Sequence, residues 1–94
     1  MILVTQRIDY IKDYGEYRDA LDHRLTIWLT EAGLKPIPVP NTLTRTELYS
    51  WIEKIQPSAL LLSGGNDLNQ YPKRDQTEKE LLCWAEKSGI PVLG

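Results

Sequence analysis

The chain has 94 residues, of which 41% are hydrophobic and 26% charged, and its formal net charge is −2 at pH 7. These values suit a single small globular domain. The 11 Lys and Arg residues are scattered, and no apolar run approaches the ~18 residues of a membrane span, so we expect neither nucleic acid nor membrane as a partner. The lone Cys83 can form no internal disulfide, which predicts a reducing, cytoplasmic location.

The first third of the chain predicts a strand followed by a helix. Residues 2–5 are apolar and predict a strand, after which residues 6–10 are polar and residues 13–17 resemble a loop. Helical spacing begins at Arg18, and Gly33 takes the position where a left-handed residue commonly ends a helix. The apolar stripe of this helix consists of Leu21, Leu25, Trp28, Leu29 and Ala32.

The middle of the chain predicts an edge strand and a second helix. Residues 34–40 carry prolines at every second position, and proline removes a ladder donor, so this strand should lie near a sheet edge. Thr44 and Glu47 have the spacing of a capping box. Apolar residues then follow at helical spacing, which predicts a helix over 45–55 that Pro57 terminates.

A continuous apolar run at residues 59–63 ends in the glycine pair Gly64 and Gly65. Such a run is typical of a parallel strand that is covered on both faces. Glycine permits positive φ and a close approach of the backbone to a ligand. Ligands bind outside the carboxyl ends of strands in parallel α/β sheets. The segment is therefore the first candidate for a site, although a glycine pair is also a common plain turn.

The last third predicts a third helix and a fourth strand. Asp75 and Thr77 both offer caps for the helix, Gly89 ends it, and residues 90–94 begin the strand. Strand and helix alternate throughout, which predicts an α/β fold, βαβαβαβ, with a mainly parallel sheet. Three helices leave one face of such a sheet poorly covered, so we expect the missing layer to come from the rest of a larger domain or from another chain.

Several side chains with chemical potential have structural explanations. Cys83 lies between apolar neighbours in a predicted helix and is expected to be a small buried hydrophobe. His23 lies beside an apolar stripe and is expected to be solvated or at its boundary. We expect Trp28, Trp51 and Trp84 in the core, and no His, Cys and carboxylate cluster has metal-ligand spacing. Tyr10, Tyr14 and Tyr17 could line a substrate or partner surface, or could pack over the sheet edge.

Three motifs resemble the class I glutamine amidotransferase fold, in its γ-glutamyl hydrolase-like branch. Residues 61–67 resemble the strand and GG-x-D segment of that branch, Arg74-Asp75-x-x-Glu78 resembles its R-D-x-x-E helix start, and residues 89–94 resemble the strand that leads into its nucleophile elbow. Residues 4–7, 18–22 and 36–41 resemble most closely the γ-glutamyl-CDP-amidate hydrolases. The similarity extends along the whole chain.

The resemblance implies a flavodoxin-like half-domain of a Cys–His–Glu hydrolase that acts on a γ-glutamyl amide without a cofactor, and its closest branch makes the nucleotide-linked γ-glutamyl-CDP-amidate a candidate substrate. It makes the backbone N–H of Gly65 a candidate oxyanion donor, with Gly64 shaping the turn. Arg7, Asn66 and Asp67 are candidate substrate-binding residues. Arg7 could contact a phosphate, or could form a surface ion pair with a neighbouring aspartate.

The same resemblance places the nucleophile two residues after Gly94, with the His and Glu further along. Residues 1–94 would then be the amino-terminal portion of one domain, inactive alone. The remaining half of the domain, or another chain, would be its partner. The alternative is a small flavodoxin-like interaction or regulatory module without catalytic activity.

Overall fold

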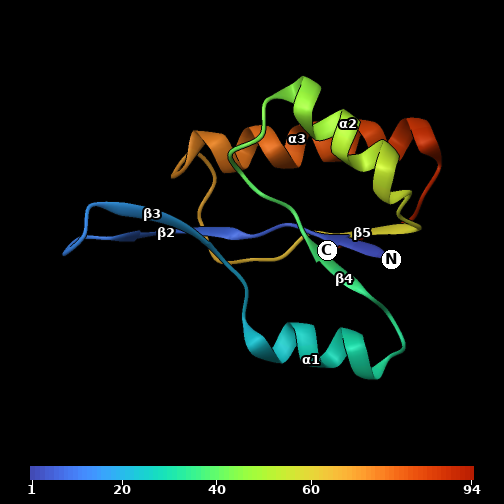
Figure 1. Ribbon diagram of the computed structural model, residues 1–94, viewed down its shortest axis with the longest axis horizontal. Coiled ribbons are helices and arrows are strands. Elements are labelled where there is room, and N and C mark those ends of the chain that lie inside the picture. The colour runs from blue at the N-terminus through green and yellow to red at the C-terminus, as the bar shows by residue number, and fades with distance from the viewer.

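The computed structural model describes residues 1–94 and contains a four-stranded parallel sheet, a separate hairpin and three helices (Figure 1). The strands of the main sheet lie in the order β4-β1-β5-β6. They are β1 (Ile2–Val4), β4 (Pro36–Pro38), β5 (Ala59–Leu61) and β6 (Val92–Leu93). The three helices are α1 (His23–Glu31), α2 (Arg45–Ile55) and α3 (Pro72–Ser88). The α/β class is confirmed, and the strand order is that of a flavodoxin-like sheet.

The helices divide unequally between the two faces of the main sheet. Figure 1 shows α2 and α3 together on one face and α1 alone on the other. The proline-rich strand β4 lies at the edge of the sheet, as its three alternating prolines predict. No helix in the structure combines the length and the apolar character that crossing a membrane requires.

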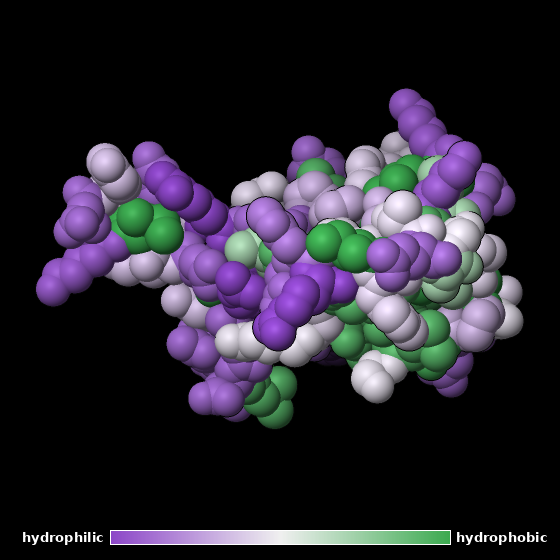
Figure 2. Space-filling model, turned by 90° about the horizontal axis from the view of Figure 1, so that it is seen from below, coloured by the Kyte–Doolittle hydropathy of each residue, from purple (hydrophilic) through white to green (hydrophobic).

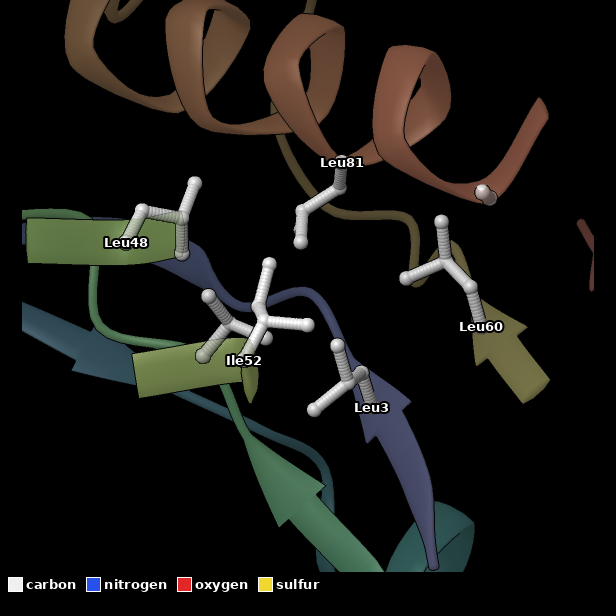
Figure 3. Packing of buried hydrophobic residues seen from close by; sticks show 7 residues of the cluster. Leu3, Leu48, Ile52, Leu60 and Leu81 are labelled. Atoms are coloured by element: carbon white, nitrogen blue, oxygen red, sulfur yellow. The ribbon is translucent and has the colours of Figure 1, made fainter. Parts of the chain in front are cut away.

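Two hydrophobic clusters follow from the alternation of side chains along the strands. Leu3 and Leu60 point to the side of α2 and α3, where they join a cluster of seven buried residues (Figure 3). The helices contribute Leu48, Ile52, Leu81 and Ala85 to it. On the other face, four buried residues form a smaller cluster, namely Ile2, Val4, Leu29 and Leu61.

A hairpin of β2 (Arg7–Ile11) and β3 (Glu16–Ala20) occupies the region where the sequence predicts a polar segment, a loop and the start of a helix. That prediction is wrong because only Ile8 of these strands is buried, so the apolar alternation that marks a strand is missing. Gly15, at φ +61°, supplies the left-handed residue of the turn. Figure 2 shows the hairpin as a projecting, mainly hydrophilic arm.

Helix α1 begins at His23 rather than at the predicted Arg18, since residues 18–20 belong to the ladder of the hairpin. The carboxylate of Asp22 caps it by accepting the backbone N–H of Arg24 at 2.8 Å. Of the predicted stripe only Leu29 is buried, and Trp28 is 59% exposed, which corrects its assignment to the core. Neighbouring helical residues are turned by about 100°, so a helix that packs through one narrow stripe leaves Trp28 in solvent. Trp51 and Trp84 do pack against the larger cluster.

The remaining boundaries divide into confirmed and wrong predictions. Helix α2 has the predicted bounds and a complete capping box of Thr44 and Glu47. Helix α3 begins at Pro72, so neither Asp75 nor Thr77 is its cap: the first accepts the N–H of Asn69, and the second donates to a backbone carbonyl. Proline at the first helical position is favourable because its missing N–H would be unpaired there anyway. Cys83 is exposed on α3, contrary to its expected burial.

Candidate functional site

The glycine pair follows β5 at the carboxyl edge of the main sheet. Gly65 has φ +125°, a conformation that side chains rarely adopt, whereas Gly64 does not have positive φ. A Cβ on Gly65 would lie 2.8 Å from the Cδ and 3.0 Å from the Cβ of Arg7. Glycine is therefore required at position 65 both by its backbone conformation and by its contact with Arg7.

A hollow of about 270 Å³ lies at this turn, and we call it the glycine hollow. It is lined by Arg7, Ala20, Leu21, Asp22, Leu25, Ser63, Gly64 and Gly65. Neither Gly64 nor Gly65 donates its backbone N–H to any group of the chain. Backbone donors without a partner beside a hollow are suited to bind a negatively charged oxygen.

Charged groups of both signs border the glycine hollow. The Nε of Arg7 donates to Asp9 at 3.1 Å, as the ion-pair alternative predicts, and its two terminal nitrogens make no hydrogen bond. Asp22 also lines the hollow, and its hydrogen bonds from Arg24 lower its pKa to about 2. Both of its carboxylate oxygens accept from Arg24, so the groups of the lining that remain without a partner are the terminal nitrogens of Arg7 and the backbone N–H groups of the glycines.

Arg74, in the first turn of α3, binds the loop that contains Gly64 and Gly65. This role was not predicted from the sequence. Its side chain is buried, and its guanidinium donates to the carbonyl of Ser63, to Oδ1 of Asn66 at 3.1 Å and to Glu78 at 2.9 Å. A cation in the first turn of a helix opposes the helix dipole. An arginine at this unfavourable position is the signal in the sequence from which its binding to the loop could have been predicted.

Two further contacts fix the ends of the loop. The N–H of Ser63 donates to Oγ1 of Thr5 at 2.8 Å, and the hydroxyl of Ser63 donates to the carbonyl of Thr5. The amide of Asn66 pairs with the backbone of Ile8 in both directions, at 2.8 Å and 3.1 Å. The turn is therefore held by Thr5 directly after β1, by β2 and by α3 together, which makes Gly65 a preorganised position.

The structure brings together three of the five predicted site residues. Arg7, Gly64 and Gly65 line the glycine hollow, whereas the amide of Asn66 is occupied by Ile8 and Arg74. Asp67 is exposed, and its backbone N–H donates to Gln70.

The lining of the glycine hollow contains one hydroxyl and no thiol or imidazole: the hydroxyl is that of Ser63, which donates its proton to the carbonyl of Thr5. Cys83 is exposed on α3, His23 is exposed at the start of α1, and neither lines the hollow. No group of His, Cys, Asp and Glu residues has the arrangement of a metal site. The groups that the lining leaves available are therefore the backbone N–H groups of Gly64 and Gly65 and the terminal nitrogens of Arg7.

No protein-family model matches the chain, and no curated protein matches it.

Proposed function

We propose that the chain supplies the oxyanion-binding portion of a cysteine-dependent γ-glutamyl amide hydrolase, related to the class I glutamine amidotransferases. The observation that carries this proposal is Gly65, which follows β5 with positive φ, an unpaired N–H and the side chain of Arg7 against it. The motifs at residues 61–67 and 89–94 support the same family.

Strand order supports a nucleophile beside this turn. β6 pairs with β5 in parallel, so both strands end at the same edge of the sheet. A cysteine supplied shortly after β6 would lie next to Gly65. Its thiolate attacks the γ-carbonyl, the amine leaves with a proton, and water hydrolyses the thioester to glutamate.

The described residues would act on both ends of the substrate. The N–H of Gly65 stabilises the oxyanion of the tetrahedral intermediate, an interaction whose loss typically costs about 3 kcal/mol. A γ-glutamyl group also carries an α-carboxylate, and the two free terminal nitrogens of Arg7 at the glycine hollow are suited to bind it. A nucleotide-linked leaving group such as CDP-amidate is supported by the resemblance alone. The lone Cys83 supports a cytoplasmic setting.

The experiment measures glutamate release from a γ-glutamyl anilide by two proteins. One is the 94-residue chain, and the other is extended past Gly94 by about a hundred residues of its reading frame. We expect release only by the extended form, and a Gly65→Ala change should lower its kcat by about a hundredfold because the N–H is turned away. Lys79→Met on the exposed side of α3 is the control. No release by either form, or an unaffected Gly65→Ala variant, would refute the proposal.

The second candidate is an interaction module, which would use the apolar surface that the chain leaves exposed. α1 alone covers its face of the sheet, and Val92 and Leu93 of the last strand are exposed. Such apolar surface is typical of an interface with the rest of a domain or with another chain. Sedimentation of the 94-residue chain distinguishes the two proposals: a discrete dimer without activity in any extended form favours the module.

A further inference from the structure

A second hollow at the carboxyl edge of the sheet is larger than the glycine hollow. Its volume is about 460 Å³, and it lies between the hairpin, residues 41–42 after β4 and residues 70–73 at the start of α3. We call it the tyrosine hollow. It shares no lining residue with the glycine hollow.

The hairpin separates the two hollows because its two faces carry different residues. Directly paired residues of an antiparallel ladder share a face, and Ile8 pairs with Asp19 as Tyr10 pairs with Tyr17. This face lines the tyrosine hollow through Ile8, Tyr17 and Asp19. The opposite face carries Arg7 and Ala20, both of which line the glycine hollow.

Aromatic rings form one wall of the tyrosine hollow. The ring centroids of Tyr10 and Tyr17 are 4.8 Å apart, and Tyr17 meets Tyr71 edge-on at 6.4 Å. Tyr17 is 71% exposed, so a face of its ring is available. Tyr17 and Tyr71 thus line a hollow rather than being covered by other side chains, which is the geometry that a ligand surface requires. Offset or edge-on contacts with a planar ligand ring would stabilise it there.

One cation in the lining has no partner. Lys73 takes part in no ion pair and its ammonium donates no hydrogen bond, whereas each Arg of the chain pairs with a carboxylate. The two carboxylate oxygens of Asp19 accept the backbone N–H and a side-chain N–H of Asn41, each at 2.9 Å. Asp19 and Lys73 are the two charged residues of the lining and carry opposite charges, so a second anionic group on a ligand would find no cation and would be repelled by Asp19.

We propose that the tyrosine hollow is a binding site for a small molecule with a planar aromatic ring and a single anionic group. The ring lies against Ile8, Tyr17 and Tyr71, and the anion meets the ammonium of Lys73. The site is separate from the γ-glutamyl hydrolase proposal, because it uses the other face of the hairpin. The backbone of Ile8 joins the two through its hydrogen bonds with Asn66.

Three probes that share a phenyl ring test this proposal by NMR titration of the 94-residue chain. They are 3-phenylpropionate, its neutral amide and phenethylamine. We expect the propionate to shift the amide signals of residues 41–42 and 70–73 with a Kd of about 1 mM, and the amide and the amine to bind at least about fivefold more weakly. Equal binding of the three probes, stronger binding of the amine, or no shifts at those residues would overturn the proposal.

Matched variants assign the two parts of the site. Lys73→Met should remove the preference for the propionate, whereas Lys79→Met, also exposed on α3, should keep it. Tyr17→Ser should weaken all three probes, whereas Tyr14→Ser should not, because Tyr14 is equally exposed at 72% but lies outside the hollow. All four positions are exposed, so the variants are expected to fold. An unchanged preference in Lys73→Met would refute the role of the ammonium.

Discussion

The two faces of the main sheet differ in how well they are covered, although the same strands serve both. On the α2–α3 face seven buried residues form the larger cluster, and on the α1 face four form the smaller one. Leu21 and Leu25 pack against the smaller cluster and also line the glycine hollow. One face therefore supplies most of the stability, and the candidate site opens on the other.

Two adjacent leucines of β5 test this difference most directly. Leu60→Ala empties space in the larger cluster and should lower the free energy of unfolding by about 4 kcal/mol. Leu61→Ala, whose side chain faces α1, should cost about 2 kcal/mol because the cavity can collapse or admit water at the thinner layer. Urea unfolding measures both. Equal losses would show that the two faces are equally packed.

Arg74 connects the stable face to the loop of the candidate site. Arg74→Met leaves the carbonyl of Ser63, Oδ1 of Asn66 and the carboxylate of Glu78 without this donor, and should cost about 3 kcal/mol. Hydrogen exchange should show a larger increase at residues 63–67 than in α2. Lys79→Met is the control from the same helix. A uniform increase of the exchange rate across the chain would contradict a specific effect of Arg74 on residues 63–67.

The glycine pair provides a matched comparison within the site itself. Gly65→Ala must strain a backbone at φ +125° and displace Arg7, so we expect a loss of about 2 kcal/mol. Gly64 has neither constraint, and Gly64→Ala should cost about 0.5 kcal/mol. Thermal unfolding of both variants measures the difference. A reversed order would contradict the preorganised turn.

Removal of the α2 cap should have a smaller effect. Thr44→Ala removes the hydroxyl that accepts the N–H of Glu47 at 3.2 Å and should cost about 1 kcal/mol. Urea unfolding of this variant and of Thr46→Ala, in the first turn but outside the capping box, checks the assignment. Similar losses in both would attribute the effect to helix propensity alone.

Loss of the charge of Asp22, the N-cap of α1, should have the smallest effect on stability, and this effect should depend on pH. The pKa of Asp22 in the folded chain is about 2, below its ordinary value of 3.8, so its contribution is complete above about pH 4 and is lost as the pH falls toward 2. Asp22→Asn should remove this part of the pH profile. We expect Asp22→Asn and the unchanged protein to differ less at pH 2 than at pH 6 in thermal melts. A constant difference would contradict the linkage.

The sequence correctly predicted those features of the fold that depend on interactions between residues close to one another in the chain. The bounds of α2 follow from Thr44, Glu47 and the apolar spacing, and Gly33 and Gly89 end their helices through left-handed conformations. The hairpin was not predicted because its strands bury almost no side chains and therefore lack an apolar pattern. The start of α3 was not predicted because its N-cap residue, Tyr71, makes no side-chain hydrogen bond and is not a typical cap.

The sequence by itself determined the α/β class, the edge position of β4 and the glycine turn after β5. These depend on apolar runs, on the missing N–H of proline and on the freedom of glycine, which act within a few residues. Only the tertiary structure decided how the turn is held and where the hollows lie. Thr5 meets Ser63, and Ile8 meets Asn66, across 58 positions of the chain, and Arg7 packs on Gly65. Such contacts leave no local pattern, because they arise only when parallel strands bring their carboxyl ends to one edge.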